Sequence, residues 1–541
     1  MDRAGRAQPA SLLRSAGIIS AAIAASRLTG LVRESVFGWL FGAGVIFDAW
    51  VLGYRVPNLA RDLFAEGALS AAFVTTFTRY LATKSREEAR ELSNIMATLI
   101  MAVVGTLCVV GIMFAPVFVN VFAPGFHAIP GKFELAVKLV RIMFPFLFLV
   151  ALSAQAQGIL NACHRFGVPA LSSSLFNIGS IVFGLAIGYG IAPRFGVAPI
   201  FGMAAGLVCG GFTQLAFQLP SVWRAGFAWR PQWNLQHEGV RHILKLMGPA
   251  ILGAASVQIN VLVNTNFAAG LRDSAGHVMN GPVSWLSYAF RFQQLPLGLF
   301  GIAIASASLP RLSHSAATLD FAAFREILSK SIAMILSLTV PSAVGLAVLG
   351  ESMIGIVYQH GRFTASDTHQ TALALSGYSA GLAAYACLKL IGPAFYALGD
   401  ARTPMLVGMA SVVVNAAMAY ITVRILGFGH AGLALTLSSV AIFNALALLL
   451  LIRPRIGGIG GREIILNTAK ILLAAAAMGA VCLLIVNWLH SRVWNVLVGV
   501  PAGVAVYYAV ASALKIDALA ETRTAVLRKF RRSTESAPGS V

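Results

Sequence analysis

The chain has 541 residues, of which 58% are hydrophobic and only 11% are charged. Soluble globular domains carry about 25% charged residues, so this composition excludes an ordinary soluble enzyme and indicates a protein that crosses a membrane many times. The chain also has 40 Lys and Arg residues against 20 Asp and Glu residues. Where this positive excess lies along the chain decides between membrane topology and a nucleic-acid-binding surface.

Hydrophobic segments of at least about 20 residues, the length that crosses a bilayer as a helix, follow one another along the chain. Open sheets cannot cross lipid, and the alternating pattern of barrel strands is missing. We therefore predict an all-α polytopic membrane protein. Its 14 predicted spans are 13–40, 46–78, 92–121, 134–161, 168–191, 197–220, 241–268, 282–308, 322–349, 367–397, 403–425, 429–452, 465–489 and 493–515.

Basic residues concentrate in every second loop. The opposite loops carry about one cation each, so the positive-inside rule predicts that both termini are cytoplasmic. The positive charge then reflects topology, and no nucleic-acid partner is expected. The cation-rich loops follow spans 2, 6, 8 and 12, and with the C-terminal tail they contain Arg79, Lys84, Arg86 and Arg90; Arg224, Arg230 and Arg241; Arg311 and Arg325; Arg453, Arg455 and Arg462; and Arg523, Arg528, Lys529, Arg531 and Arg532.

A weak internal repeat recurs at a spacing of about 235 residues. Pro169 recurs as Pro404, and the pairs beginning at Phe195 and Leu63 recur near the same offset. This indicates two six-helix lobes around a central cavity plus a C-terminal helix pair, as in many secondary transporters. The predicted domains are an N-terminal lobe, a C-terminal lobe, the final helix pair and a basic cytoplasmic tail, at 1–222, 223–455, 456–516 and 517–541.

Charged residues inside the predicted spans mark the candidate site. Each would cost about 2.5–3.5 kcal/mol at the bilayer centre, so they must face protein or water. Arginines dominate, which predicts a cationic cavity for an anionic substrate, because the guanidinium fork binds phosphate oxygens bidentately. The first two spans hold Arg27, Arg33, Glu34, Asp48, Arg55, Arg61, Asp62 and Glu66, and later spans add Arg291 and Lys389.

Some of these charges can instead pair with one another. Arg27 and Glu34 are seven residues apart on one helix, as are Asp48 and Arg55, so structural ion pairs account for part of the set. Arg291 has no acidic neighbour in its own span. We therefore predict that Arg27, Arg33 and Arg291 face the substrate.

Motifs for other chemistry are missing from the sequence. It contains no HExxH, GxSxG or P-loop pattern, and its five cysteines form no CxxC pair. We therefore predict no catalytic residue, no metal site and no cofactor, and a transporter rather than an enzyme.

Several separate motifs, in order, resemble the MurJ (MviN) family of lipid II flippases. The resemblance covers about residues 12 to 515 and implies the fold of the multidrug/oligosaccharidyl-lipid/polysaccharide exporter superfamily. That fold has two six-helix lobes and a lipid-facing groove at helices 13 and 14. The motifs are Ser26–Glu34, Phe41–Gly44, Asp48-Ala49, Pro57–Leu59, Phe64–Ala68, Gly248–Gly253, Val283–Trp285 with Arg291, Gly361–Thr364 and Thr403-Pro404.

The resemblance implies a function and a site. It implies transfer of lipid II, a polyprenyl-pyrophosphate-linked peptidoglycan precursor, to the periplasmic leaflet of the bacterial inner membrane. It makes Arg27, Arg33 and Arg291 the pyrophosphate-binding residues, and Asp48, Arg61 and Glu66 cavity or gating residues. We expect a monomer whose partners are lipid II, membrane lipids and other cell-wall synthesis proteins. The coupling ion stays open, with the membrane potential acting on the charges as one driving force.

Three alternatives remain at this point. A flippase for another polyprenyl-pyrophosphate-linked glycan would use the same cationic cavity. A cation-driven drug exporter should show carboxylates in the cavity, where this sequence places arginines. A membrane enzyme would need a catalytic cluster, for which Asp48 and Glu66 are the remaining candidates.

Overall fold

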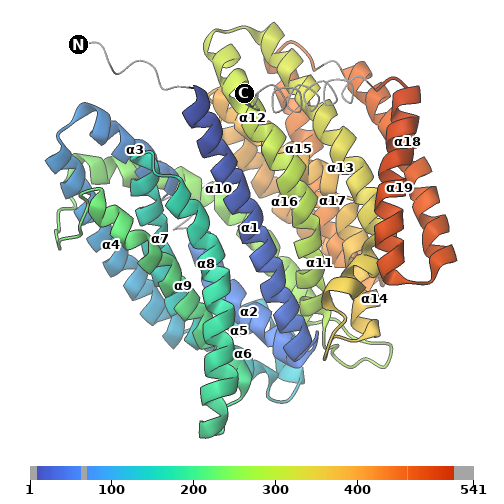
Figure 1. Ribbon diagram of the computed structural model, residues 1–541, viewed down its shortest axis with the longest axis horizontal. Coiled ribbons are helices and arrows are strands. Elements are labelled where there is room, and N and C mark those ends of the chain that lie inside the picture. The colour runs from blue at the N-terminus through green and yellow to red at the C-terminus, as the bar shows by residue number, and fades with distance from the viewer. Residues whose placement is uncertain (1–8, 63–69, 460, 517–541) are drawn as a thin grey trace, which may run out of the picture. The chain divides into compact units, whose positions relative to one another are not determined.

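The computed structural model describes residues 9–62, 70–459 and 461–516. All the regular elements in these ranges are helices (Figure 1), which confirms the predicted all-α class. The chain divides into two compact units, residues 1–284 and 285–541. The predicted lobe boundary at 222/223 lies inside unit 1, which continues through α10 because α10 packs on α3, α4 and α5. The predicted lobe boundaries stay a prediction.

Unit 1 consists of helices joined mostly by short turns. Several breaks between its helices fall next to prolines: Pro145 stands in the first turn of α7, where its missing N–H costs nothing. The elements are α1 (Pro9–Phe41), α2 (Val45–Ala60), α3 (Ser70–Thr83), α4 (Arg86–Met113), α5 (Ala115–Phe122), η2 (Pro124–Ala128), α6 (Lys132–Met143), α7 (Pro145–Ala162), α8 (Gly167–Leu185), η3 (Ala186–Ile191), η4 (Ala192–Phe195), α9 (Pro199–Arg224) and α10 (Glu238–Ala269).

Helix α8 and the turn η3 that continues it pack backbone to backbone against α9 along a row of glycines. A Cβ added at Gly206 would lie 2.3 Å from the Cα of Gly184, and one added at Gly202 would lie 2.3 Å from the Cα of Gly188. Small residues at a helix interface allow this close approach, and the resulting van der Waals packing is one of the forces that associate helices in lipid. The α8–α9 pair therefore forms a rigid wall of unit 1, on which α1 and α7 also pack.

Unit 2 begins within α11 and repeats this all-helical construction. The final two helices lie side by side in Figure 1 and pack against α13. The elements are α11 (Pro282–Pro296), η5 (Leu297–Ile302), α12 (Ala303–Ala317), α13 (Phe321–Tyr358), α14 (Ala365–Ser379), α15 (Leu382–Ala397), α16 (Arg402–Tyr420), η6 (Ile421–Ile425), α17 (Gly429–Ile452), η7 (Arg453–Arg455), α18 (Gly461–Leu489) and α19 (Arg492–Ala513).

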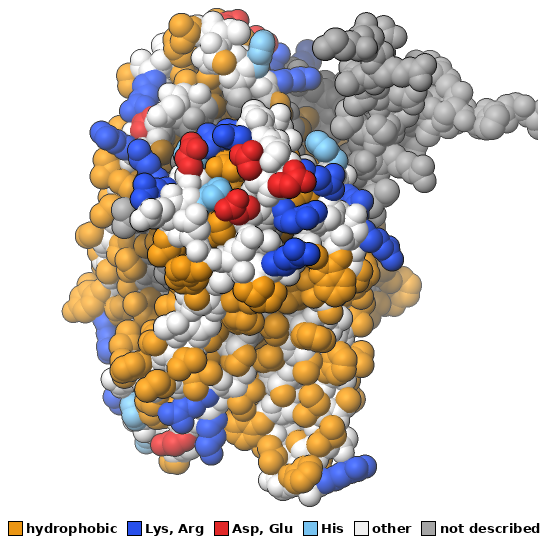
Figure 2. Space-filling model, turned by 90° about the vertical axis from the view of Figure 1, so that its left-hand side faces the viewer, with side chains coloured by type: hydrophobic (Ala, Val, Ile, Leu, Met, Phe, Trp, Pro, Cys, Tyr) orange, Lys and Arg blue, Asp and Glu red, His pale blue; other side chains and the backbone are white. Residues whose placement is uncertain are grey.

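The surface and the helix lengths are those of a membrane protein. Figure 2 shows a face with a broad hydrophobic surface between two margins where charged side chains gather. Within the described ranges, 10 helices are long and apolar enough to cross a membrane, or 11 if the bent pair α14 and α15 forms one span. The predicted spans 13–40, 46–78 and 241–268 are not among them; they fall on α1, on α2 and α3, and on α10. The count of 14 therefore stays a prediction.

The predicted internal repeat has a counterpart in the backbone. The π-helical turn η3 follows α8, and the π-helical turn η6 follows α16, 235 residues later. His164 and Gly399 are at the same offset, and both have positive φ, at 57° and 75°. His164 stands in the turn before α8, and Gly399 stands in the turn before α16. Both units therefore reverse and bend their chains at corresponding places. The third repeated pair, at Leu63, lies outside the described residues.

Candidate substrate-binding site

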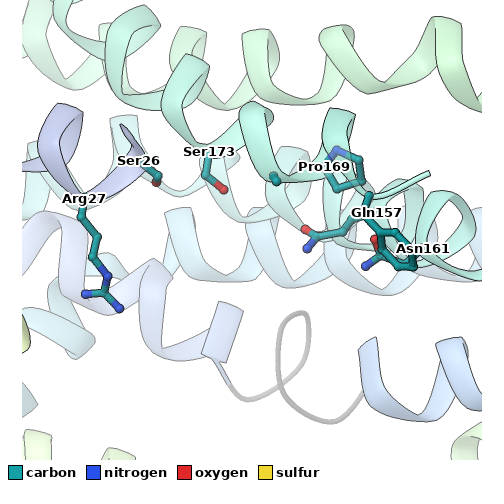
Figure 3. Close-up of a pocket in the computed structure, with 8 residues that line it drawn as sticks. Ser26, Arg27, Gln157, Asn161, Pro169 and Ser173 are labelled. Carbon is teal, nitrogen blue, oxygen red and sulfur yellow. The ribbon is translucent and has the colours of Figure 1, made fainter. Parts of the chain in front are cut away.

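A polar cavity of about 420 Å³ lies in unit 1 between α1, α7 and α8. Figure 3 shows Arg27 of α1 at one end, Gln157 and Asn161 of α7 toward the other, and Ser173 of α8 between them. Volumes of about 300–1,000 Å³ are typical of small-molecule sites. The cavity therefore places one of the three predicted substrate arginines in a space that can hold a ligand.

Side-chain hydrogen bonds hold the walls of this cavity together. The Nδ2 amide of Asn177 on α8 donates to the Ser26 carbonyl, at 3.1 Å, and to the Thr29 hydroxyl, at 3.2 Å. These two bonds join α8 to α1 directly beside Arg27. Buried polar groups usually find such partners, since leaving them unpaired in an apolar interior costs free energy. The position of Arg27 is thereby fixed relative to the rigid α8–α9 wall.

The second predicted arginine, Arg33, is buried, with 7% of its surface exposed. Its guanidinium carbon lies 5.9 Å from the ring centre of Tyr54 and 5.4 Å from that of Phe176. Its Nη2 lies 3.3 Å from Oε1 of Glu34, the neighbouring residue on α1. Its Nη1 is buried and has no hydrogen-bond partner among the described residues. Two aromatic rings and one carboxylate therefore orient a guanidinium that keeps unused donor capacity, which suits it to bind an anion.

Asp48, predicted as a cavity or gating residue, is fully buried in a network of unit 1. Its carboxylate accepts from Nζ of Lys132 at 2.7 Å and from the backbone N–H groups of Gly281 and Ser284 at 2.9 and 2.8 Å. It thereby binds the amino end of α6 and caps the amino end of α11. The in-helix pair with Arg55 considered from the sequence does not form, because seven residues rise about 10 Å along a helix.

Arg55 of α2, and the charged residues Arg61 and Asp62 that follow α2, contact neighbours in the same unit. Arg55 donates from Nη1 to the hydroxyl of Thr265 on α10 at 2.5 Å. Arg61 lies 3.1 Å from the carboxylate of Asp62, which also accepts from the amide of Gln258 at 3.4 Å. The structure thus places Arg61 in a partly buried cluster between α2 and α10. Glu66, the third predicted gating residue, lies outside the described residues.

Arg291, the third predicted substrate arginine, belongs to unit 2. It lies half-buried on α11, after Phe290, whose ring packs edge-on against Tyr378 with centroids 5.6 Å apart. Two residues further on, the amide of Gln293 donates to the Tyr378 carbonyl at 3.0 Å. These contacts fix the turn of α11 that carries Arg291 against α14. That the three arginines bind one ligand stays a prediction.

Unit 2 contains a second cavity of about 590 Å³ between α11, α13, α18 and α19. Its lining is almost wholly apolar and includes Phe292, Pro341, Met478 and Val504. Gly345 lines it as well, and a Cβ added there would meet nothing closer than Met478 Cε at 4.0 Å. A cavity of this composition suits a hydrocarbon chain.

Sequence reasoning missed several residues that shape the site. Lys132 lies between two predicted spans, and its pairing with Asp48, 84 residues away, cannot be inferred from one sequence. Gln157 and Asn161 are not among the predicted site residues, although a polar pair four residues apart in an apolar span is a usable signal, because such residues share one helix face.

A polytopic bundle with a cationic, polar site in one unit and an apolar cavity in the other has the features of a membrane transporter for an amphiphilic anion. The sequence matches the family described as lipid II flippase MurJ over residues 38–504. Because this match covers most of the chain, the chain belongs to the lipid II flippase MurJ family.

Individual relatives agree with this family. The chain is 33% identical to the probable lipid II flippase MurJ of Vibrio cholerae over 80% of this chain and 81% of the relative. It is 32% identical to the lipid II flippase MurJ of Burkholderia cenocepacia over 82% of this chain and 84% of the relative.

Solved structures share the fold. A lipid II flippase MurJ in an inward closed conformation superposes with a TM-score of 0.76 at 27% identity, covering 93% of this chain and 99% of that one. An inward-facing MATE-family multidrug resistance transporter of the MOP superfamily gives 0.66 at 16% identity, over 80% and 94% of the two chains, and it shares the fold alone.

Proposed function

We propose that this chain transfers lipid II, a polyprenyl-pyrophosphate-linked disaccharide-pentapeptide, from the cytoplasmic to the periplasmic leaflet of the bacterial inner membrane. The observation that carries the proposal is the guanidinium of Arg33, whose Nη1 is buried without a partner among the described residues. Glu34 contacts Nη2 of this guanidinium, and Nη1 is left as a donor that a further anionic oxygen can accept from; a pyrophosphate is the anionic group of this substrate. Membership in the lipid II flippase MurJ family supports the same substrate.

The two cavities match the two chemical parts of the substrate. Arg27 and Arg33 on α1, with Arg291 on α11, would hold the pyrophosphate oxygens through charge-assisted hydrogen bonds. The apolar cavity of unit 2 would hold the polyprenyl chain, whose transfer to water would be costly. Transport would then proceed by alternating access, with the head group crossing while the tail stays in an apolar environment.

We infer the topology and the energy source from the charge distribution. The cation-rich loops support a cytoplasmic location of both termini under the positive-inside rule. The membrane potential supplies about 2.3 kcal/mol per charge per 100 mV, and it can act on the arginine-bound diphosphate. We propose that a single chain carries out this cycle and that proteins of cell-wall synthesis are its partners.

The test is rescue of cells depleted of their own lipid II flippase, with lipid II exposure in the outer leaflet as the readout. The chain should restore exposure, and Arg291→Ala should not, although it inserts at the same level. Arg194→Ala is the matched control, since Arg194 is exposed on η4 and lines neither cavity. No rescue by a well-expressed chain would contradict the proposal and favour a flippase for another polyprenyl-linked glycan. Rescue by Arg291→Ala would mean that Arg291 has a structural role and is not needed to bind the substrate.

A further inference from the structure

The cavity of unit 1 extends well beyond the arginine that the proposed function uses. Arg27 occupies one end, and Gln157 and Asn161 line the other, with Ser173 between (Figure 3); Phe166 lines the same cavity. Apart from Arg27, the lining contains amides, hydroxyls and an aromatic ring and has no charged residue. A diphosphate therefore explains the Arg27 end of the cavity and leaves the chemistry of the other end unexplained.

The polar groups at the uncharged end are not used for packing. Gln155, two residues before Gln157, is buried and donates to the Ser93 carbonyl at 2.9 Å, so it joins α7 to α4. Gln157 is half-buried, and its side-chain amide forms no hydrogen bond with the described residues; the same holds for Asn161. Polar groups in a membrane-spanning unit are costly unless something pairs with them. Their shared orientation into one cavity points to a ligand with many neutral donors and acceptors.

The frame behind these side chains is rigid. Gln218 on α9 donates to the hydroxyl of Ser153 at 2.6 Å and to that of Ser172 at 3.3 Å. All three residues are buried, and they lock α7, α8 and α9 together close to the residues that line the cavity. A site whose supporting helices are fixed loses little conformational entropy when it binds a ligand.

We propose that Gln157, Asn161, Ser173 and Phe166 form a carbohydrate subsite, which binds the sugar attached to the diphosphate held at Arg27. Each amide offers two donors and one acceptor, and a serine hydroxyl offers both roles, which matches the hydroxyl and acetamido groups of a hexosamine. The Phe166 ring provides an apolar surface for the C–H face of the sugar ring. This inference rests on the proposed function, and it assigns the selectivity for a glycosylated lipid to α7 and α8.

The experiment compares two lipids that share the tail and the diphosphate. The full chain in lipid nanodiscs is titrated with lipid II and with undecaprenyl pyrophosphate, which lacks the sugars. The wild type should bind lipid II more tightly. The double substitution Gln157→Leu/Asn161→Leu should weaken lipid II binding roughly tenfold, because two hydrogen bonds are lost, and leave binding of undecaprenyl pyrophosphate unchanged. Gln214→Leu on α9, outside the lining of the cavity, is the matched control.

The outcomes distinguish a failure of the carbohydrate subsite from a failure of the proposed function on which it rests. Unchanged lipid II affinity in the double variant would overturn the carbohydrate subsite, and so would an equal loss for both lipids. Unchanged binding of undecaprenyl pyrophosphate shows in the same sample that the variant is folded. If the wild type binds neither lipid, the proposed function itself fails. If the double variant does not fold, the single substitution Asn161→Leu, at the end of α7, is tested in its place. The ratio of its affinities for lipid II and undecaprenyl pyrophosphate is then compared with that of the wild type.

Discussion

The ammonium group of Lys132 lies 2.7 Å from the carboxylate of Asp48, and each side chain is only 1% exposed. Lys132 also lies 4.4 Å from the ring centre of Phe126. The pair joins the first turn of α6 to the first turn of α2, and Asp48 in turn caps α11. A buried ion pair of this kind costs about 3–5 kcal/mol when one partner is removed, because the other charge is left uncompensated.

We therefore expect Lys132→Met to lower the free energy of unfolding by about 3 kcal/mol. Adding Asp48→Asn should recover part of that loss, because no buried charge then remains, so the double-mutant cycle should give a coupling of at least about 1 kcal/mol. Denaturant unfolding of the purified chain measures both. Lys138→Met is the control, since Lys138 is exposed on the same helix. Equal stability of Lys132→Met and wild type would contradict a structural role for the pair.

Arg33→Lys should weaken lipid II binding about tenfold without changing the unfolding temperature. Lysine keeps the charge but cannot lie as a planar fork between Tyr54 and Phe176 or contact two oxygens at once. Titration of the chain in nanodiscs measures the affinity, with Arg194→Lys on exposed η4 as the control. If the lysine variant binds as tightly as wild type, only the charge at this position matters.

Gly206→Ala should destabilise unit 1 by about 1–3 kcal/mol, because the added methyl group would lie 2.3 Å from the Cα of Gly184. Gly190→Ala makes the same chemical change where no atom lies within 4 Å, and it should leave stability almost unchanged. Thermal unfolding in detergent compares the two variants. A similar unfolding temperature for both would mean that α8 and α9 separate easily, contrary to the close packing.

The turn between α15 and α16 should be sensitive to acid. Desolvation raises the pKa of Asp400, but hydrogen bonds from Thr403 and Arg455 outweigh it and lower the pKa from 3.8 to about 2. The ionised carboxylate therefore stabilises the fold above about pH 4, and this contribution disappears as the pH falls through about 2. Because Arg455 is partly exposed, we expect at most about 1 kcal/mol.

The check is the difference in unfolding free energy between wild type and Asp400→Asn, which keeps the side-chain shape without the charge. It should be largest near neutral pH and shrink between pH 4 and pH 2. A difference that stays constant over this range would exclude the charge as its source.

Some of these features could be predicted from the sequence and others could not. The all-α class follows from hydropathy alone, and the burial of Arg33 and Asp48 agrees with the cost of placing charges in lipid. The partner of Asp48 could not be predicted, because nothing local links it to Lys132. Which residues meet is decided by the faces that distant helices turn toward each other.

The cavity of unit 1 illustrates the same limit. Arg27 can be predicted because a charge in a membrane span is conspicuous, whereas Gln157 and Asn161 resemble the many amides that join helices. Gln155 is such an amide, since it is buried and donates to the Ser93 carbonyl, whereas Gln157 is half-buried and lines the cavity. The function of each amide depends on whether its helix face meets another helix or a cavity.

The glycine row between α8 and α9 has a consequence for motion. Two backbones in direct contact have no flexible side chains between them to absorb sliding, so the two helices should move as one body during transport. Rearrangement within unit 1 is then left to helices with less extensive packing, such as α10 on α3, α4 and α5. Backbone amides of α8 and α9 should accordingly exchange their hydrogens more slowly than those of α10 in every state of the cycle.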